Sequence, residues 1–205
     1  MFKEKLIIFA AFLALAFAVA PFDCNCVSAK NIFQKIRTEN TNKNTLYTID
    51  KYQEKYFEII KRNDILLNFE DDKTLNKDRK ELKKLFKKVT KQINSNNKYL
   101  KEYNNIEKRY SKCEETTTLG INQFAENNYI EVDDLLNRVY KEVKSKISAD
   151  DFKQLTASEK EWLKEVNDYK KVFDSLGLGT IGVSTYYGYE IDMREFRTLL
   201  LMLYL

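Results

Sequence analysis

The sequence predicts an all-α protein in which an antiparallel helical bundle-like C-terminal domain follows a basic helical segment rich in Lys and Asn. Three observations support this fold class. The only proline is Pro21, charged residues make up 32% of the chain, and apolar side chains recur at steps of three and four residues. Together these features favour long solvated helices over a sheet-rich fold.

The first 29 residues have the three parts of a secretory signal peptide. Lys3 and Lys5 precede an uncharged run over residues 6–20, and Val27–Ala29 suits signal peptidase, so we predict cleavage before Lys30. The uncharged run is shorter than the roughly 20 apolar residues that cross a bilayer. We therefore expect a periplasmic or secreted protein, with an uncleaved membrane anchor as the rival interpretation.

Charge divides the rest of the chain into two parts. Residues 30–112 carry 22 Lys and Arg against 12 Asp and Glu, whereas residues 113–205 carry 11 against 17. We therefore predict three regions: the signal 1–29, a basic helical segment 30–112 of unknown role, and an acidic helical domain 113–205.

The basic segment contains three predicted helices. We expect residues 31–44, which are polar, to be a loose tail, and residues 46–67 to form the first amphipathic helix. A second apolar stripe runs over 75–93, the polar run 94–97 interrupts it, and a third stripe follows over 99–110.

The acidic domain contains three more predicted helices. An apolar face marks the first over 132–147, and Ser148 with Asp151 has the form of a capping box that opens the second. Gly177 is placed to end that helix in a left-handed conformation. We expect the glycine segment that follows to be flexible and the apolar run 191–205 to be a buried last helix.

Composition argues against catalysis. The chain has no His, so the commonest general base is missing and Cys113 has no possible His partner. Carboxylates that are adjacent in sequence, such as Asp133 and Asp134, point to different faces of a helix. We therefore predict a protein that is not an enzyme, with no cofactor and no metal site built from His and Cys, while a glycosidase-type pair of carboxylates stays open.

Two phosphate-type motifs have simpler structural explanations. Residues 177–182 match G-x-G-x-x-G, but that loop binds dinucleotides when it follows a strand, and here it follows a predicted helix. The lysine-rich stretch 77–91 is predicted to be the solvated face of a helix. Export separates it from nucleic acid, so anionic lipid or cell-wall polymer are the ligands that remain.

A polar group lies beside the apolar stripe of the acidic domain. Steps of three and four place Asp133, Asn137 and Tyr140 on one helix face, next to Leu136. Buried polar side chains require hydrogen-bond partners, and Arg197 on the last helix is the predicted one. We interpret the group as a polar clamp between two helices, with a binding surface as the alternative. The thiol of Cys113 is expected to be buried or inert.

Residues 113–205 resemble the LprI-type lysozyme inhibitor family of exported bacterial proteins. Two positions depart from that family's pattern: Phe124 stands where a cysteine is expected, and Val166–Asn167 stands where an Arg-Asp pair is usual. The resemblance therefore implies a lost or reduced disulfide framework. The residues that carry it, and that we take as candidate structural or binding positions, are Cys113, Thr117, Asp133, Leu136, Asn137, Tyr140, Trp162 within Glu159–Leu163, Gly179 and Arg197.

The resemblance implies a binding protein without turnover. It would cover the surface of a lysozyme-like enzyme or another envelope protein, and the acidic half would attract a basic lysozyme electrostatically. The alternative is an envelope-associated scaffold whose basic helices hold anionic lipid or cell-wall polymer. Neither reading includes nucleic acid or a dinucleotide as a partner.

Overall fold

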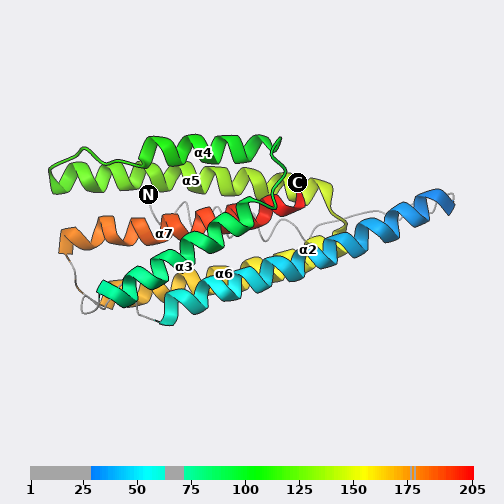
Figure 1. Ribbon diagram of the computed structural model, residues 1–205, viewed down its shortest axis with the longest axis horizontal. Coiled ribbons are helices and arrows are strands. Elements are labelled where there is room, and N and C mark those ends of the chain that lie inside the picture. The colour runs from blue at the N-terminus through cyan, green and yellow to red at the C-terminus, as the bar shows by residue number, and fades with distance from the viewer. Residues whose placement is uncertain (1–28, 63–71, 176, 178) are drawn as a thin grey trace. The chain divides into compact units, whose positions relative to one another are not determined.

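A computed structural model describes residues 29–62, 72–175, 177 and 179–205 of the chain (Figure 1). Contacts divide the chain into two compact units, residues 1–36 and 37–205. The predicted signal peptide falls almost entirely on residues 1–28, which lie outside the described residues, so its cleavage stays a prediction. Among the described helices, none is long and apolar enough to cross a membrane.

The predicted all-α fold is confirmed, because every regular element in the described residues is a helix. The helices are long and are joined by short connections, as the absence of proline after residue 21 favours. In chain order they are α2 (Ala29–Arg62), α3 (Asp72–Thr90), α4 (Lys98–Tyr110), α5 (Thr118–Lys146), α6 (Ala149–Ser175), α7 (Gly179–Leu201) and the short 3-10 helix η2 (Met202–Tyr204).

Two segments expected to be irregular are helical. The predicted loose tail 31–44 belongs to α2, which contains no Gly or Pro, so each residue can extend the helix by one further hydrogen bond. The glycine segment is also helical from Gly179 onward. There the aromatic side chains of Tyr187 and Tyr189 are buried, and this packing outweighs the low helix propensity of the neighbouring glycines.

The predicted helix ends are confirmed. The backbone N–H of Asp151 donates to Ser148 Oγ over 3.1 Å, and Ser148 Oγ donates to Asp151 Oδ2 over 2.8 Å, so the pair caps α6. Gly177 follows α6 with φ +59°, the left-handed conformation expected there. The polar run 94–97 separates α3 from α4, and Asn97 caps α4 by accepting from the N–H of Tyr99.

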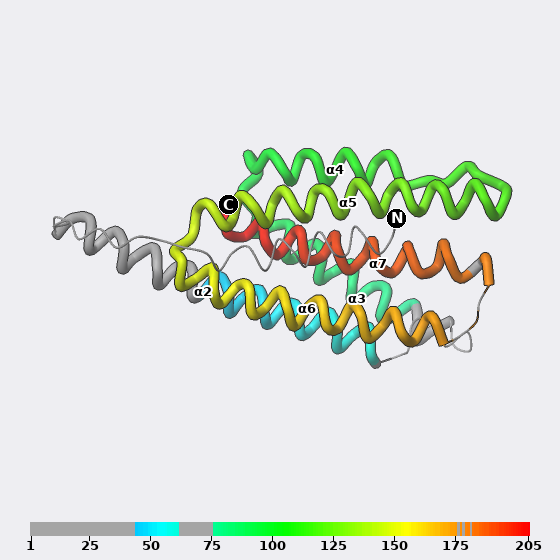
Figure 2. The backbone as a smooth tube through the Cα atoms, turned by 180° about the vertical axis from the view of Figure 1, so that it is seen from behind, coloured from blue at the N-terminus to red at the C-terminus, as the bar shows by residue number. Residues whose placement is uncertain are grey.

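Helix α7 lies at the centre of the 37–205 unit. It runs parallel to α5 and antiparallel to α6, as the two views of the chain agree (Figure 2). Helices α2 and α3 pack on it through aromatic rings: Phe196 stacks on Tyr56 with ring centroids 4.7 Å apart and touches Phe86 at 4.9 Å. The predicted burial of the leucine-rich end of α7 is confirmed, since Leu199 and Leu200 are fully buried.

Helix α4 lies antiparallel along α5, and hydrogen bonds between polar side chains join the two helices. Tyr99 donates to Glu142 over 2.7 Å, and Arg138 donates to Glu102 over 2.8 Å. The residue numbers of each pair sum to nearly the same value, as an antiparallel register requires. The loop between α4 and α5 contains the boundary at residue 112 that the charge distribution predicts, so basic and acidic segments share one core. The division into a basic segment 30–112 and an acidic domain 113–205 stays a prediction.

The capping pair at the start of α6 gives the first prediction. Ser148→Ala removes the oxygen that accepts from the Asp151 N–H, and should lower the free energy of unfolding by about 1 kcal/mol. Urea unfolding followed by circular dichroism measures the change. Ser145→Ala is the control, because that exposed hydroxyl only donates back to the Glu142 carbonyl. Equal stability of the two variants would refute the capping role.

Candidate functional site

Arg197 is a fully buried cation that joins three helices. Its Nε donates to Glu159 Oε1 of α6 over 2.8 Å, and its Nη2 donates to Ser158 Oγ over 3.0 Å. Its Nη1 lies 3.5 Å from Gln53 Oε1 on α2. Ser158 in turn donates to Asp50 of α2 over 2.7 Å. One guanidinium therefore fixes the positions of α2, α6 and α7 relative to one another.

Arg194 forms a second polar junction one turn earlier on α7. Its Nε donates to Asp133 Oδ1 of α5 over 2.9 Å, and its Nη1 pairs with Glu190 on its own helix. The guanidinium carbon lies 4.6 Å from the ring centroid of Tyr129 and 6.0 Å from that of Trp162. The cation is therefore held between a carboxylate pair and aromatic faces, which compensates for its loss of water.

The spacing of these residues explains why Glu159 and Trp162 occur together in the segment Glu159–Leu163. Glu159 and Trp162 are three residues apart on α6, and Arg194 and Arg197 are three residues apart on α7. Because the two helices are antiparallel, Glu159 meets Arg197 while Trp162 faces Arg194. Glu159 and Trp162 are thus the α6 side of a contact between α6 and α7 that consists of two residue pairs.

The polar clamp predicted around Asp133 exists, but its predicted partner was wrong. Asn137 Nδ2 donates to the Asp133 carbonyl over 2.9 Å and to its Oδ2 over 3.0 Å, and the carboxylate bonds Arg194, not Arg197. Parallel packing places Arg194 level with Asp133, whereas Arg197 turns toward α6. The Tyr140 hydroxyl lies 3.4 Å from the Thr156 hydroxyl on α6.

The candidate residues therefore fall into two groups. Those of the first group lie inside the bundle or at its helix contacts, and they are Asp133, Leu136, Asn137, Tyr140, Trp162 and Arg197. Those of the second group, Cys113, Thr117 and Gly179, lie at one end of the bundle.

This end, which we call the exposed end, comprises residues 111–119, the start of α5, the end of α6 and the start of α7. Thr117 caps α5 by accepting from the Gly120 N–H over 3.0 Å, and Asn122 of α5 donates to the Thr180 carbonyl of α7 over 3.1 Å. Gly179 begins α7 with φ +60°. Cys113 is exposed in the loop between α4 and α5, so the expected burial of its thiol is wrong, while its expected inertness stays a prediction.

Apolar side chains reach solvent at the exposed end. Leu119, Val172 and Val183 are 68%, 38% and 40% exposed, and only Tyr47 joins them as an exposed large hydrophobic among the described residues. No helical period marks these positions, so sequence reasoning missed them. A local signal existed for Leu119, which directly follows three threonines in the loop before α5.

Exposed carboxylates occur at the same end of the bundle, together with the exposed Lys112 and Lys171. Glu114, Glu115 and Glu126 are exposed, as is Asp174 near the end of α6. The Glu115 carboxylate lies against Gly120, where a Cβ would collide with it, at the start of α5. A helix N-terminus favours such a negative group. At this end the exposed carboxylates outnumber the exposed lysines.

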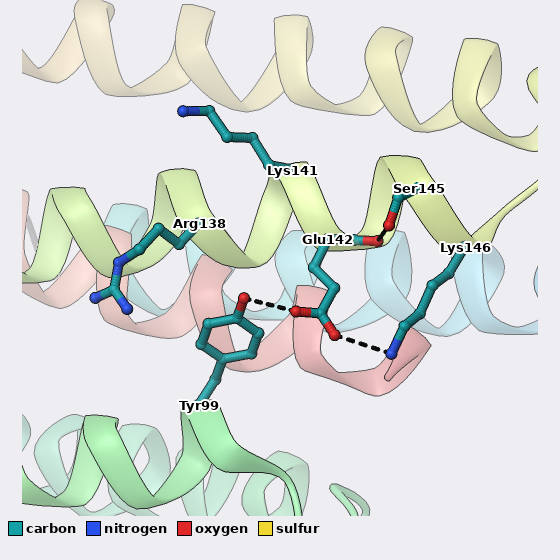
Figure 3. A pocket seen from close by; sticks show the side chains of 6 residues that line it. All are labelled: Tyr99, Arg138, Lys141, Glu142, Ser145 and Lys146. Carbon is teal, nitrogen blue, oxygen red and sulfur yellow. Dashed lines mark hydrogen bonds and ion pairs between the residues drawn. The ribbon is translucent and has the colours of Figure 1, made fainter.

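A shallow, open hollow lies elsewhere, between α4 and α5 (Figure 3). Glu142 lies at its centre and accepts from Tyr99, from Lys98 over 2.7 Å and from Lys146 over 2.9 Å. Hydrogen bonds from Lys98 first, then from Lys146 and Tyr99, lower the pKa of Glu142 to about 2. Its oxygens are thus occupied by the chain itself, and the hollow is a joint between helices.

Three carboxyl groups gather where α4 meets α7. Glu195 is only 5% exposed, and it is hydrogen-bonded to the exposed Glu107 of α4, with Asp192 nearby. Burial, then the charge of Glu107 and the hydrogen bond to it, raises the pKa of Glu195 well above its usual value. No Lys or Arg of the described residues forms an ion pair with these groups.

This cluster lacks the spacing of a glycosidase carboxyl pair. Glycosidase carboxyl pairs stand about 5 Å or more apart to admit a sugar or water, whereas Glu107 and Glu195 are in direct hydrogen-bond contact. Within the described part of the chain, no group of three or more His, Cys, Asp or Glu side chains is arranged to hold a metal ion.

Comparison with known proteins identifies the segment that contains both groups of residues. Residues 109–201, a little under half of the chain, match the family model described as "Lysozyme inhibitor LprI". The resemblance inferred from the sequence is therefore confirmed, with bounds close to the predicted 113–205. No curated protein and no solved structure matches the chain.

The buried Arg197 gives the second prediction. Arg197→Met leaves the Glu159 carboxylate buried without its cation, and should lower the free energy of unfolding by about 3–5 kcal/mol at pH 7. Urea unfolding measures the loss. Arg138→Met is the control, since it breaks an exposed pair with Glu102 and should cost less than about 1 kcal/mol. Adding Glu159→Gln to Arg197→Met should restore part of the lost stability.

The carboxyl cluster gives the third prediction. The folded state holds a proton on Glu195 at pH values where the unfolded chain has lost it, because the folded pKa is raised. Stability from this group is thus complete below the ordinary glutamate pKa of about 4.3 and is lost as pH rises through the folded pKa. Glu195→Gln should flatten this decline, so that its advantage over the native protein is larger at pH 8 than at pH 4.

Thermal unfolding across that pH range tests the cluster. Glu161→Gln removes an exposed carboxylate of α6 and should leave the pH dependence close to that of the native protein. A Glu195→Gln curve that runs parallel to the native one from pH 4 to pH 8 would rule out a raised pKa at Glu195.

Proposed function

Residues 109–201 match the model of the LprI lysozyme inhibitor family, and from this match we propose that the chain binds a basic, lysozyme-like enzyme and blocks it without turnover. The observation that carries the proposal is the exposed end. There, exposed apolar side chains occur at an end of the bundle whose exposed carboxylates outnumber its exposed lysines, all within the matched segment.

The interior of the matched domain supports a non-catalytic role. Arg194 and Arg197 are both engaged by carboxylates of the same chain, and Asn137 is engaged by Asp133. These groups stabilise the contacts between α5, α6 and α7 and do not converge on an open cavity. Such a framework fixes the positions of the helices whose ends present the exposed end.

Charge gives the exposed end its specificity for a basic partner. Glu114, Glu126 and Asp174 would attract a cationic enzyme over a distance of about one Debye length, some 10 Å at 0.1 M salt. Leu119 would then be the apolar anchor, because two-thirds of its side chain reaches solvent. Lys112 and Lys171 are also exposed at this end, so the attraction rests on the excess of carboxylates over lysines there.

Titration of the purified protein into a basic c-type lysozyme tests the proposal. We expect saturable binding by calorimetry, weakened by added salt, and protection of a cell-wall suspension from lysis with the same concentration dependence. Absence of both binding and protection at low salt would reject the proposal. Binding without protection would show that the exposed end covers a surface away from the lysozyme cleft, and would reject inhibition.

The fourth prediction locates the binding surface. The double variant Glu114→Gln/Leu119→Ala should weaken binding to lysozyme about tenfold or more, because it removes one steering charge and the apolar anchor. The matched control is Glu161→Gln/Tyr47→Ala, which removes one exposed carboxylate and one exposed hydrophobic away from the exposed end. Equal affinity of the two double variants would show that the exposed end is not the contact surface.

A further inference from the structure

Helix α3 presents an exposed set of cations, while its own carboxylates are engaged elsewhere. Asp78 is 1% exposed, and Glu81 pairs with Lys55 of α2 over 3.2 Å. Neither Asp78 nor Glu81 is therefore available to pair with the lysines on the outer surface of α3. The exposed lysines of α3 and the turn that follows it are Lys77, Lys80, Lys83, Lys84, Lys87, Lys88 and Lys91.

Five of these residues form a straight row, which we call the lysine stripe: Lys77, Lys80, Lys84, Lys87 and Lys91. Steps of three and four residues place them on one helix face. At 1.5 Å per residue the row extends about 21 Å along the helix. The last member stays in line, because the Lys91 N–H donates to the Lys87 carbonyl over 3.2 Å.

No member of the lysine stripe forms an ion pair with a carboxylate of the described residues. Like charges at these spacings repel, and each such pair costs a few tenths of a kcal/mol. The contact between α4 and α5 shows the opposite arrangement, since Arg138 and Lys98 there face Glu102 and Glu142 directly. An uncompensated row of this length therefore points to an anion supplied from outside the chain.

The shape of the row indicates which kind of anion. A helix that inserts into a membrane surface presents apolar side chains beside its cations. The apolar side chains of α3 are instead turned inward, with Leu85 and Val89 buried, and no large hydrophobic of its described part is exposed. The row continues along the whole part of the helix whose side chains are described, with Lys83 and Lys88 beside it. Phe86, the aromatic residue of α3, packs inward against Phe196, and Tyr52 of α2 lies under Lys88. Such a row suits a linear polyanion better than a nucleic acid whose bases must stack on aromatic rings or a bilayer into which a helix inserts.

We propose that the lysine stripe binds a linear, phosphate-bearing polymer of the cell wall. This function is separate from the exposed end and does not require that the protein inhibit lysozyme. It would concentrate the protein on the wall that lysozymes attack. Since the stripe belongs to α3, it lies outside the segment that matches the LprI family.

Binding of poly(glycerol phosphate) teichoic acid to the purified protein, followed across a range of salt concentrations, tests the proposal. The stripe variant changes all five lysines to glutamine. The control variant changes five exposed lysines on other elements, Lys101, Lys108, Lys112, Lys153 and Lys164, with the same loss of net charge. Far-UV circular dichroism checks that both variants keep the helical fold.

We expect the stripe variant to bind at least tenfold more weakly than the native protein at 0.1 M salt, and the control variant to bind within about threefold of it. The slope of log affinity against log salt should become shallower by roughly 3 in the stripe variant, because each phosphate contact on a single-stranded polyanion contributes about 0.7.

Three outcomes would overturn the proposal. Equal weakening in both variants would show that net charge alone is responsible. Tighter binding to phosphatidylglycerol vesicles than to teichoic acid, at equal phosphate concentration, would assign the stripe to a lipid surface. Tighter binding to double-stranded DNA would assign it to nucleic acid. Inhibition of lysozyme is measured in the same samples, and its presence or absence leaves these outcomes unchanged.

Discussion

The buried ion pair between Arg197 and Glu159 is the constraint on which the rest of the bundle depends. Removing two charges from water is costly, and only close geometry with further hydrogen bonds offsets that cost. Here the geometry requires α6 to lie antiparallel to α7 in one register, and Gln53 brings α2 to the same guanidinium. A slip of one turn would leave a charge buried without a partner. The ion pair thus contributes one specific arrangement of the helices, where an apolar contact alone would tolerate several.

This arrangement separates the buried candidate residues from those that would recognise a partner. Trp162 and Arg197 are buried, and they specify how the helices pack. A partner protein would contact exposed side chains such as Leu119 and Glu114 at the exposed end. Function in a shared fold resides in sites of this kind and not in the fold itself. Two members with the same interior could therefore differ in which enzyme they bind.

Much of this fold could be predicted from the sequence, because apolar periodicity and capping residues act within a few residues of chain. The cap at Ser148 and the end of α6 at Gly177 are both local in this sense. The partner of Asp133 could not be predicted, since periodicity tells which face of a helix is buried but not which residue of another helix lies level with it. The exposed thiol of Cys113 and the exposed Leu119 were missed for a related reason. The type of a residue predicts only how often such residues are buried, whereas the packed structure shows which individual side chains lie beyond the helix contacts.

The pattern of paired and unpaired charge separates structural from functional electrostatics in this protein. Where two helices must be held together, opposite charges meet, as Arg138 meets Glu102. Where charges of one sign are left facing one another, stability is lost. Two such places lie among the described residues: the carboxyls of Glu107 and Glu195, and the lysine stripe. The carboxyl pair can lower its cost by holding a proton, because burial raises the pKa of Glu195. Lysines in water stay charged at neutral pH, and no carboxylate of the described residues forms an ion pair with the stripe, so an external polyanion is the partner that its geometry fits.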